Sequence, residues 1–223
     1  MSNIASIAID FMGRGGKKLR PRLCKAVYTA FGGVDDVSCL CEAVECFHKA
    51  SLVHDDIQDG DEMRYGRPAV WKEHGIAVAI AVGDWLVARG YQLIAQSGFA
   101  SAAQMLAATV ESHLNLCEGQ GDDLLNPSAN PLKETVFNPD AYVSVCQRKT
   151  GEAFALAAQL GALAAGGDAA VARMFGLTYG VLFQINDDLT DGASIDVLGA
   201  LKKRWEEKLA QLPWADEIRR HFI

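Results

Sequence analysis

Acidic residues gather at a position whose spacing suits metal binding. The segment HDDIQD contains Asp55, Asp56 and Asp59. Residues four apart on an α-helix share one face, so Asp55 and Asp59 would repel each other unless a cation lay between them. Carboxylate oxygens favour a hard ion such as Mg²⁺, which usually shares its coordination shell with water and with phosphate oxygens of a substrate. Alone, the segment is more typical of a solvated, acidic end of a helix.

A second aspartate cluster repeats this spacing near the other end of the chain. The segment FQINDDLTD contains Asp187, Asp188 and Asp191, again after an apolar helical stretch. Helical bundles build metal sites from carboxylates that project inward from facing helices. Two copies of the cluster favour a metal site shared between two helices over two unrelated acidic surfaces.

Basic residues occur in three further segments. GGKKLRP places Lys17 and Arg20 at the start of a predicted helix, where free backbone N–H groups also attract anions. Arg64 follows the first aspartate cluster, and Lys149 lies within an otherwise apolar helical stretch. His48 precedes Asp55 by seven residues and therefore shares its helix face. Each of these residues alone is as well explained by a solvated cation or, for His48, by a buried core histidine.

Taken together, the acidic and basic segments describe a site for two diphosphates. One diphosphate is held through metal ions on the aspartates, and the other directly by lysine and arginine. A metal ion neutralises the charge on a departing phosphate oxygen. An apolar cavity without water would protect the carbocation that this departure leaves. The sequence therefore predicts the ionisation of an organic diphosphate.

The composition restricts the remaining possibilities. The chain has 223 residues, 50% of them apolar, and a formal net charge of −7, which opposes nucleic acid as a main partner. Its length predicts one domain over residues 1–223. The N-terminus lacks the pattern of a secretory signal, and we expect no transmembrane segment because the apolar run from Ile76 is cut at Asp84. Six cysteines without zinc-like spacing indicate reduced thiols in a cytoplasmic protein.

The apolar residues recur with a helical period almost throughout, and alternation rich in Val, Ile and Thr is scarce. We therefore expect an all-α fold. Proline is favoured in the first turn of a helix and glycine after the last, so these residues mark the ends of the helices. The expected helices cover residues 21–31, 38–59, 70–96 (as one helix or two), 101–116, 141–165, 169–191 and the tail from 197, with loops at 60–68 and 126–139.

Four segments resemble, in order and spacing, the trans-isoprenyl diphosphate synthases of the polyprenyl synthetase family. They are GGKKLRP, HKASLVHDDIQDGDEMRYGRP, QRKTGE and FQINDDLTD, which extend over residues 15–191. The resemblance implies a bundle of antiparallel helices around a deep central cavity, usually in a homodimer. It also implies a Mg²⁺-dependent prenyltransferase, with three ions beside the bound diphosphate. Such an enzyme condenses isopentenyl diphosphate head to tail with an allylic diphosphate.

The resemblance also assigns roles to individual residues. The implied metal ligands are Asp55, Asp59, Asp187 and Asp191. The residues implied in catalysis are Asp55, Asp56, Asp59, Lys149, Asp187 and Asp188. The implied contacts to isopentenyl diphosphate are Gly16, Lys17, Arg20 and His48. The implied contacts to the allylic substrate are Arg64, Lys149, Thr150 and Gln184.

The sequence departs from the family pattern at Tyr65 and in its length. Tyr65 stands where the family has a second arginine, so we expect Tyr65→Arg to lower the Michaelis constant for isopentenyl diphosphate. The chain is short before Gly15 and after Asp191. Either it is naturally reduced or flexible segments are missing from it, and we favour missing segments.

Product length is implied by two small residues, Ala50 and Ser51, one turn before Asp55. In the family, a bulky aromatic at these positions stops chain growth early. Its absence implies a product longer than the farnesyl chain, and we expect geranylgeranyl diphosphate. Phe47, His48 or a residue of a neighbouring helix is the candidate for a deeper floor of the cavity.

Two other functions fit parts of the pattern. A class I terpene cyclase shares the ionisation chemistry, but the last glutamate of its second metal motif is replaced by Ser194, and GGKKLRP would have no purpose there. A non-catalytic, regulatory subunit of a heteromeric prenyl synthase would account for Tyr65 but leaves two intact aspartate clusters without a use. Turnover by the purified chain separates these alternatives.

Overall fold

The computed structural model describes residues 3–125, 138–190, 192 and 195–222. Within these residues helices form almost the whole fold, and the one sheet is a two-stranded antiparallel hairpin, which confirms the all-α prediction. The elements are α1 (Ile4–Gly13), α2 (Leu19–Ala30), α3 (Ser38–Asp59), β1 (Met63–Arg64), β2 (Arg67–Pro68), α4 (Val70–His74), α5 (Ile76–Ala95), α6 (Ala102–Leu125), α7 (Pro139–Cys146), a π-helical turn (Gln147–Gly151), α8 (Glu152–Ala165), α9 (Ala169–Thr190), α10 (Ile195–Ala210) and α11 (Ala215–Phe222).

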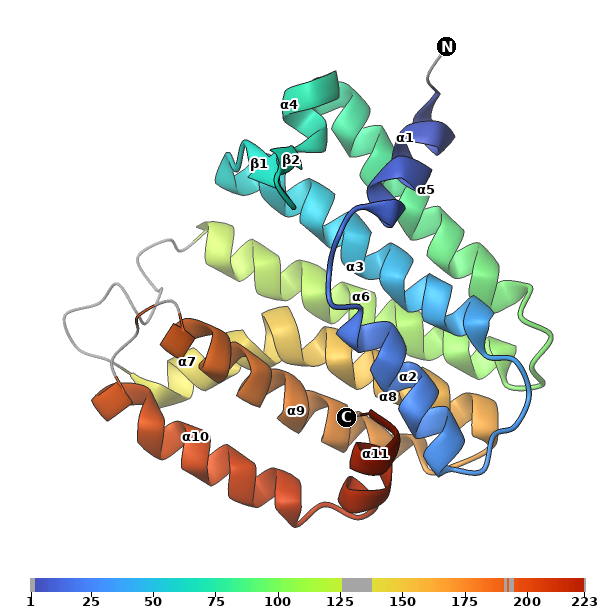
Figure 1. Ribbon diagram of the computed structural model, residues 1–223, viewed down its shortest axis with the longest axis vertical. Helices are drawn as coiled ribbons and strands as arrows, with labels where there is room; N and C mark the ends of the chain where they lie inside the picture. Colours follow the sequence, from blue (N-terminus) through green and yellow to red (C-terminus); the bar gives the residue numbers. More distant parts are fainter. Residues whose placement is uncertain (1–2, 126–137, 191, 193–194, 223) are drawn as a thin grey trace.

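The core lies between closely packed helices of this bundle, in which α3 and α5 run antiparallel, as α8 and α9 do, while α2 runs in the same direction as α8 (Figure 1). α3 packs against α5, and α8 packs against both α2 and α9. Glycine permits the closest of these contacts: a Cβ at Gly176 of α9 would lie 2.3 Å from the carbonyl oxygen of Phe154 on α8. Gly161 of α8 has the same role toward α2, where an added Cβ would lie 2.3 Å from the carbonyl oxygen of Cys24. The backbones of these helices therefore touch, which fixes the separation of the residues they carry.

The C-terminal ends of α3, α6 and α9 lie at the same end of the bundle (Figure 1). α3 ends at Asp59, within the first aspartate cluster, and α9 ends at Thr190, within the second. The fold thus brings both clusters to one end of the molecule. Asp191, the last implied metal ligand, lies outside the described residues.

The stretch 70–96, expected to form one helix or two, forms two: α4 and α5 meet at Gly75, whose φ of 86° is positive. Two other helices differ from the sequence prediction. α6 continues through Gly119 to Leu125, because this glycine lets the helix pass close to the π-helical turn: an added Cβ would lie 2.8 Å from Cβ of Arg148. α1, for which the sequence analysis predicted no helix, packs against α5.

The predicted helix 141–165 is interrupted by the π-helical turn between α7 and α8. A π turn pairs each carbonyl with the N–H group five residues later, and such turns are frequent at functional sites. This turn carries Lys149 and Thr150, two of the implied substrate contacts. α7 itself begins as the sequence favours, with Asn138 accepting backbone hydrogen bonds and Pro139 in the first turn. Residues 126–137, most of the predicted loop, lie outside the described part.

Among the described helices, α5 alone has the length and apolar composition of a membrane span. That is weak evidence, since interior helices of other proteins meet the same criterion. The expectation of no transmembrane segment rests on the break in the apolar run at Asp84, although the helix itself continues to Ala95. All six cysteines lie in the described residues as free thiols; Cys24, Cys46 and Cys146 are buried. The assignment of residues 1–223 to one domain stays a prediction.

Candidate active site

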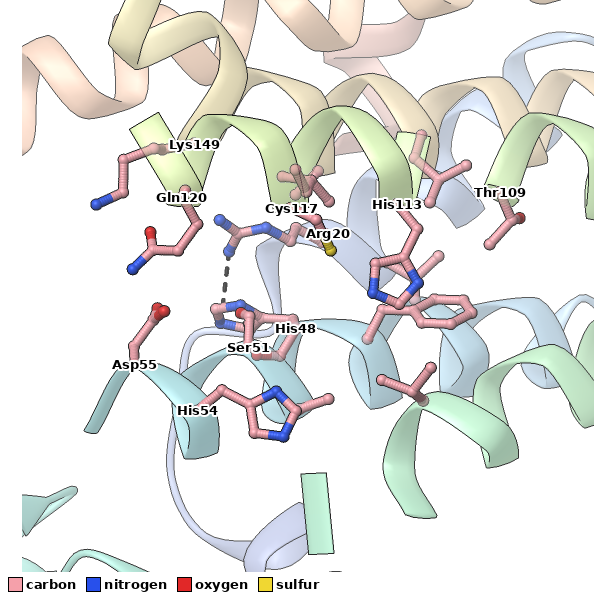
Figure 2. Close-up of a pocket in the computed structure, with 18 of the residues that line it drawn as sticks. Arg20, His48, Ser51, His54, Asp55, Thr109, His113, Cys117, Gln120 and Lys149 are labelled. Atoms are coloured by element: carbon pink, nitrogen blue, oxygen red, sulfur yellow. Dashed lines mark hydrogen bonds between the residues drawn. The ribbon is translucent and has the colours of Figure 1, made fainter. Parts of the chain in front are cut away.

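A cavity of about 360 Å³ opens between α3, α6 and the π-helical turn. Figure 2 shows Asp55, Gln120 and Lys149 at one end of it and Thr109 and His113 toward the other. The predicted site residues that line it are Arg20, His48, Ala50, Ser51, Asp55 and Lys149. The other predicted site residues that the structure describes do not line the cavity; they are Gly16, Lys17, Asp56, Asp59, Arg64, Thr150, Gln184, Asp187 and Asp188.

One face of α3 forms the long wall of the cavity. Val44, Phe47, Ser51 and Asp55 recur at spacings of three or four residues and therefore project to the same side. At the helical rise, the wall from Val44 to Asp55 is about 16 Å long. The Ser51 hydroxyl donates to the carbonyl oxygen of His48 (2.9 Å), so it presents little unpaired polarity to the cavity. The wall runs from a carboxylate at one end to apolar side chains at the other.

Aromatic side chains from three helices meet near the apolar end. The Phe47 ring on α3 packs edge-on against Tyr91 of α5, with ring centres 5.2 Å apart, and against His113 of α6 at 6.1 Å. The Tyr91 hydroxyl and Nδ1 of His113 are hydrogen-bonded at 3.0 Å. Gly90 leaves room for this cluster, because a Cβ there would lie 2.7 Å from the Phe47 ring. Phe47 and His113 line the cavity, so they restrict its depth.

Asp55 is the carboxylate that faces the cavity. Its burial raises its pKa to about 6; the nearby Asp59 carboxylate acts in the same direction, and Lys149 opposes it. Gln58 accepts a hydrogen bond from the Gln120 amide (2.8 Å), which joins α3 to α6 beside Asp55. A negative charge at this position is therefore costly without a cation close by.

Asp56 and Arg64 form a buried ion pair behind the cavity. The Asp56 side chain is fully buried, and Nε of Arg64 donates to its Oδ1 at 2.7 Å. Arg64 also reaches Asp61 at 3.3 Å. Oδ2 of Asp56 is buried without a hydrogen-bond partner. Arg64 therefore fixes the β1–β2 hairpin to the end of α3, and its implied contact with the allylic substrate stays a prediction.

The second aspartate cluster is held by a chain of hydrogen bonds. Thr150 donates to Oε1 of Gln184 (2.7 Å), and the Gln184 amide donates to Oδ1 of Asp188 (3.0 Å). The Tyr142 hydroxyl donates to Oδ2 of Asp188. Burial, followed by this hydrogen bond, raises the pKa of Tyr142, so it stays protonated as the donor. Asp187 is exposed and comes three residues after Gln184 on α9.

A basic corner faces the cavity from α2. The Arg20 guanidinium lies 4.4 Å from the centre of the Phe154 ring and 3.4 Å from Nε2 of His48, as Figure 2 shows for the latter pair. Nε of Arg20 is buried without a partner. Burial lowers the pKa of Arg20 to about 10, so it remains charged at neutral pH. Burial, with Arg20, Lys49 and Arg64 nearby, lowers the pKa of His48 to about 2. An anion would find one fixed positive charge and a neutral imidazole here.

The carboxylates fit a hard metal ion by their chemistry. Among the described residues, no group of three or more His, Cys, Asp and Glu side chains is gathered that would hold a metal by itself. Asp59 and Asp187 are exposed, and Asp55 carries a raised pKa that a cation would lower. Mg²⁺ is commonly held by one or two carboxylates together with substrate phosphates, which suits this arrangement.

Sequence reasoning missed three contributors to the site. Lys49 is buried beneath the GGKKLRP segment, Tyr142 holds Asp188, and Tyr91 packs on Phe47. Lys49 lies on α3 between His48 and Ala50, and a lysine on the buried side of a helix was a signal for its burial, although not for its partners. Tyr142 and Tyr91 act through contacts between distant segments, for which the sequence carries no local signal.

Comparison with known proteins shows clear relatives. A family model described as polyprenyl synthetase matches residues 2–199. The short chain isoprenyl diphosphate synthase of Methanothermobacter thermautotrophicus is 35% identical over 185 residues, covering 81% of this chain and 55% of that protein. The octaprenyl diphosphate synthase of Haemophilus influenzae is 32% identical over 202 residues, covering 88% of this chain and 59% of that protein. The chain thus spans little more than half the length of these relatives.

A solved structure is similar over most of the chain. The polyprenyl synthase from Caulobacter crescentus, crystallised with calcium and isoprenyl diphosphate, superposes with a TM-score of 0.74 and 31% sequence identity. The match covers 89% of this chain and 61% of that chain. The fold of this chain is therefore shared with that synthase over most of its length.

Proposed function

Because the chain belongs to the polyprenyl synthetase family, we propose that it is a prenyltransferase that condenses isopentenyl diphosphate head to tail with an allylic diphosphate. The observation that carries this proposal is the cavity with Asp55 at one end and an apolar wall below it. The family members named above support the reaction class. The spread of their names, from short-chain to octaprenyl synthases, leaves the product length to the residues of this chain.

In the proposed reaction, Asp55, Asp59, Asp187 and Asp191 would hold Mg²⁺, three ions in all beside the diphosphate, and the metal would supply positive charge to the leaving oxygen. Lys149 lines the cavity near Asp55, where its charge suits the allylic diphosphate. Thr150 and Gln184 orient Asp188, and Asp56 orients Arg64, at the edge of the same site. These residues fix where the allylic carbon–oxygen bond breaks.

The second diphosphate belongs to isopentenyl diphosphate and lies on the basic corner. Arg20 presents a charged guanidinium, and His48 a neutral ring whose N–H group can donate a hydrogen bond to an anion. Gly16 and Lys17 lie exposed on the segment before α2, where a diphosphate would reach them. The apolar wall excludes water while the allylic bond breaks, the isopentenyl alkene forms the new carbon–carbon bond, and its lost proton passes to the departing diphosphate.

We propose geranylgeranyl diphosphate as the product. Ala50 and Ser51 leave the first part of the cavity open, and Phe47 with His113 narrows it further from Asp55. Several further relatives are named geranylgeranyl diphosphate synthases, which supports this length. A homodimer and a cytoplasmic location complete the proposal, both from the resemblance and the composition.

The test is incubation of the purified chain with isopentenyl diphosphate, each allylic diphosphate in turn and Mg²⁺, followed by sizing of the products. We expect turnover, with a twenty-carbon product as the main species. A chain that gives no product with any allylic substrate would contradict the proposed function. A chain that stops at fifteen carbons would contradict the product length alone.

A further inference from the structure

Lys49 of α3 is fully buried. A lysine is rarely buried to this extent unless its ammonium group is paired. Nζ of Lys49 donates hydrogen bonds to the carbonyl oxygens of Arg14 and of Gly15, the latter at 3.0 Å. Both acceptors belong to the segment between α1 and α2 that carries Gly16 and Lys17. Lys49 therefore acts on this segment and is not itself exposed to a ligand.

These two hydrogen bonds fix the orientation of the segment's peptide groups. In a trans peptide, the N–H group points opposite to the preceding carbonyl, and the described chain has no cis peptide bonds. With the Arg14 and Gly15 carbonyls directed at Lys49, the N–H groups of Gly15 and Gly16 point away from it. The φ angles of 23° at Gly15, 102° at Gly16 and 48° at Lys18 are all positive. Glycine adopts positive φ at little cost, so this backbone has other conformations open to it, and the hydrogen bonds from Lys49 favour the one observed.

Tyr65 completes the support from the β1–β2 hairpin. The Lys49 ammonium lies 4.1 Å from the centre of the Tyr65 ring and 5.3 Å from that of Phe11. The ring also covers the two glycines, because a Cβ would lie 2.8 Å from it at Gly15 and 3.3 Å from its hydroxyl at Gly16. A cation over an aromatic face is stabilised most when water is excluded from it. Tyr65 thus covers both the lysine and the backbone that the lysine holds.

We propose that Lys49 and Tyr65 are positioning residues that hold the Gly15–Lys17 segment in the conformation that binds isopentenyl diphosphate. The proposal rests on the proposed function, since it concerns the same substrate. The charge near Lys49 is balanced from its own helix by Glu45, a buried carboxylate one turn earlier. Lys18 and Arg14 are the other charges that act on Lys49, and both are positive.

The same geometry reverses the expectation for Tyr65→Arg. The Tyr65 ring lies 4.1 Å from the Lys49 ammonium. An arginine at position 65 would put a positive charge in place of this ring, and the two cations would repel each other. We therefore expect the single substitution to raise the Michaelis constant for isopentenyl diphosphate. Combining it with Lys49→Met removes the repulsion and should lower that constant relative to Tyr65→Arg alone.

The experiment compares Lys49→Met, Tyr65→Ala and Tyr65→Phe in the full chain. Steady-state kinetics give kcat and a separate Michaelis constant for each substrate, and calorimetry gives the dissociation constant of isopentenyl diphosphate. Lys72→Met is the matched control: this lysine also lies over an aromatic ring, that of Trp71 at 5.6 Å, but it is exposed and pairs with Glu62.

The expected result is a change confined to one substrate. Lys49→Met and Tyr65→Ala should raise the Michaelis and dissociation constants for isopentenyl diphosphate about tenfold or more, the size of one lost charge-assisted contact. The constant for the allylic substrate and kcat at saturation should stay within about twofold, a difference too small to signify a lost contact. Tyr65→Phe, which keeps the ring, and Lys72→Met should behave like the wild type.

The outcomes separate the two proposals. If the wild type gives no product, the proposed function fails and the positioning role fails with it. If the wild type is active and Tyr65→Ala leaves the constants for isopentenyl diphosphate unchanged, the positioning role alone fails. Tyr65 is 38% exposed, so its variants will fold even if Lys49→Met does not. Equal losses for both substrates would also overturn the proposal, because they indicate general damage to the site.

Discussion

The hydroxyl of Tyr142 on α7 donates a hydrogen bond to Oδ2 of Asp188 on α9. The other oxygen of this carboxylate accepts from Gln184 at 3.0 Å. Both oxygens of Asp188 are engaged within the protein, whereas its neighbour Asp187 is exposed. Adjacent aspartates of one motif therefore have different tasks: we expect Asp187 to meet the ligand and Asp188 to orient the end of α9.

Replacement of Asp55 or Asp187 by Asn should abolish turnover without unfolding the chain. Each change removes a negative charge from an acidic cluster, which relieves repulsion in the free protein but weakens the hold on cations in the transition state. We expect a loss of about a thousandfold or more in kcat, measured with Mg²⁺ as the sole divalent metal. Asp216→Asn, an exposed change on α11, is the control and should be silent. Substantial turnover in either variant would contradict the two-cluster site.

Tyr142→Phe should impair both stability and turnover. Loss of the hydroxyl leaves Oδ2 of the half-buried Asp188 without its donor, so the free energy of unfolding should fall by about 1 kcal/mol. The loss of turnover should be smaller than in Asp187→Asn, because Gln184 still orients Asp188. Tyr28→Phe is the matched control: its buried hydroxyl accepts from the Asp35 N–H at 3.0 Å, far along the chain from either cluster. A control that loses as much turnover as Tyr142→Phe would show that the effect is one of stability alone.

Product length should respond to volume along the α3 wall. Ser51→Phe adds a ring near Asp55 and should shorten the product, while Phe47→Ala empties space near Tyr91 and should lengthen it. Chromatography of the dephosphorylated products measures both. Leu52→Phe adds the same ring to α3 beside the cluster of Ala50 and Val53, outside the cavity wall, and should leave the product unchanged. If Ser51→Phe and Phe47→Ala give the wild-type product, this wall does not set the length.

Acid should destabilise the chain in part through His48. Burial, with Arg20, Lys49 and Arg64 nearby, lowers its pKa to about 2, so the folded state keeps this ring neutral while the unfolded chain protonates it below its usual pKa of 6.5. The unfolded state then binds more protons, and stability falls as the pH drops below 6.5. Between pH 7 and pH 5 this group accounts for about 2 kcal/mol of unfolding free energy.

Urea unfolding of His48→Gln at both pH values tests this expectation. The variant should lose less stability than the wild type on going from pH 7 to pH 5, and the difference is the contribution of His48. His221→Gln, on the exposed face of α11, should follow the wild type. Parallel losses in His48→Gln and the wild type would show that His48 is not held neutral.

Local patterns sufficed for the helices and for the residues that share a helix face. Val44, Phe47, Ser51 and Asp55 line one wall because a helical period alone places them there. The sequence also predicts that the small residues Ala50 and Ser51 lie beside the product, and both residues line the cavity. These features depend on neighbours within one helix, which is the range over which a sequence pattern carries information.

Features that depend on contacts between distant segments could not be predicted from the sequence. The passage of α6 through Gly119 follows from its approach to Arg148, and the burial of Lys49 follows from carbonyls more than thirty residues earlier. Neither glycine in a helix nor lysine beside a histidine predicts such a partner. The π-helical turn is a further case, because its residues have ordinary helical preferences and its register is set by the helices on either side.

That π-helical turn makes one part of the cavity sensitive to the number of residues rather than to their type. A π turn accommodates one residue more than an α turn, so deletion of a single residue between Gln147 and Gly151 would leave a regular helix, with α7 and α8 in nearly the same orientation. Tyr142 lies on α7 outside the turn and would keep its place beside Asp188. The side chains within the turn would change direction, and Lys149 would leave the cavity wall near Asp55. A deletion that preserves the helices and the second aspartate cluster would thus still remove a cation from the first.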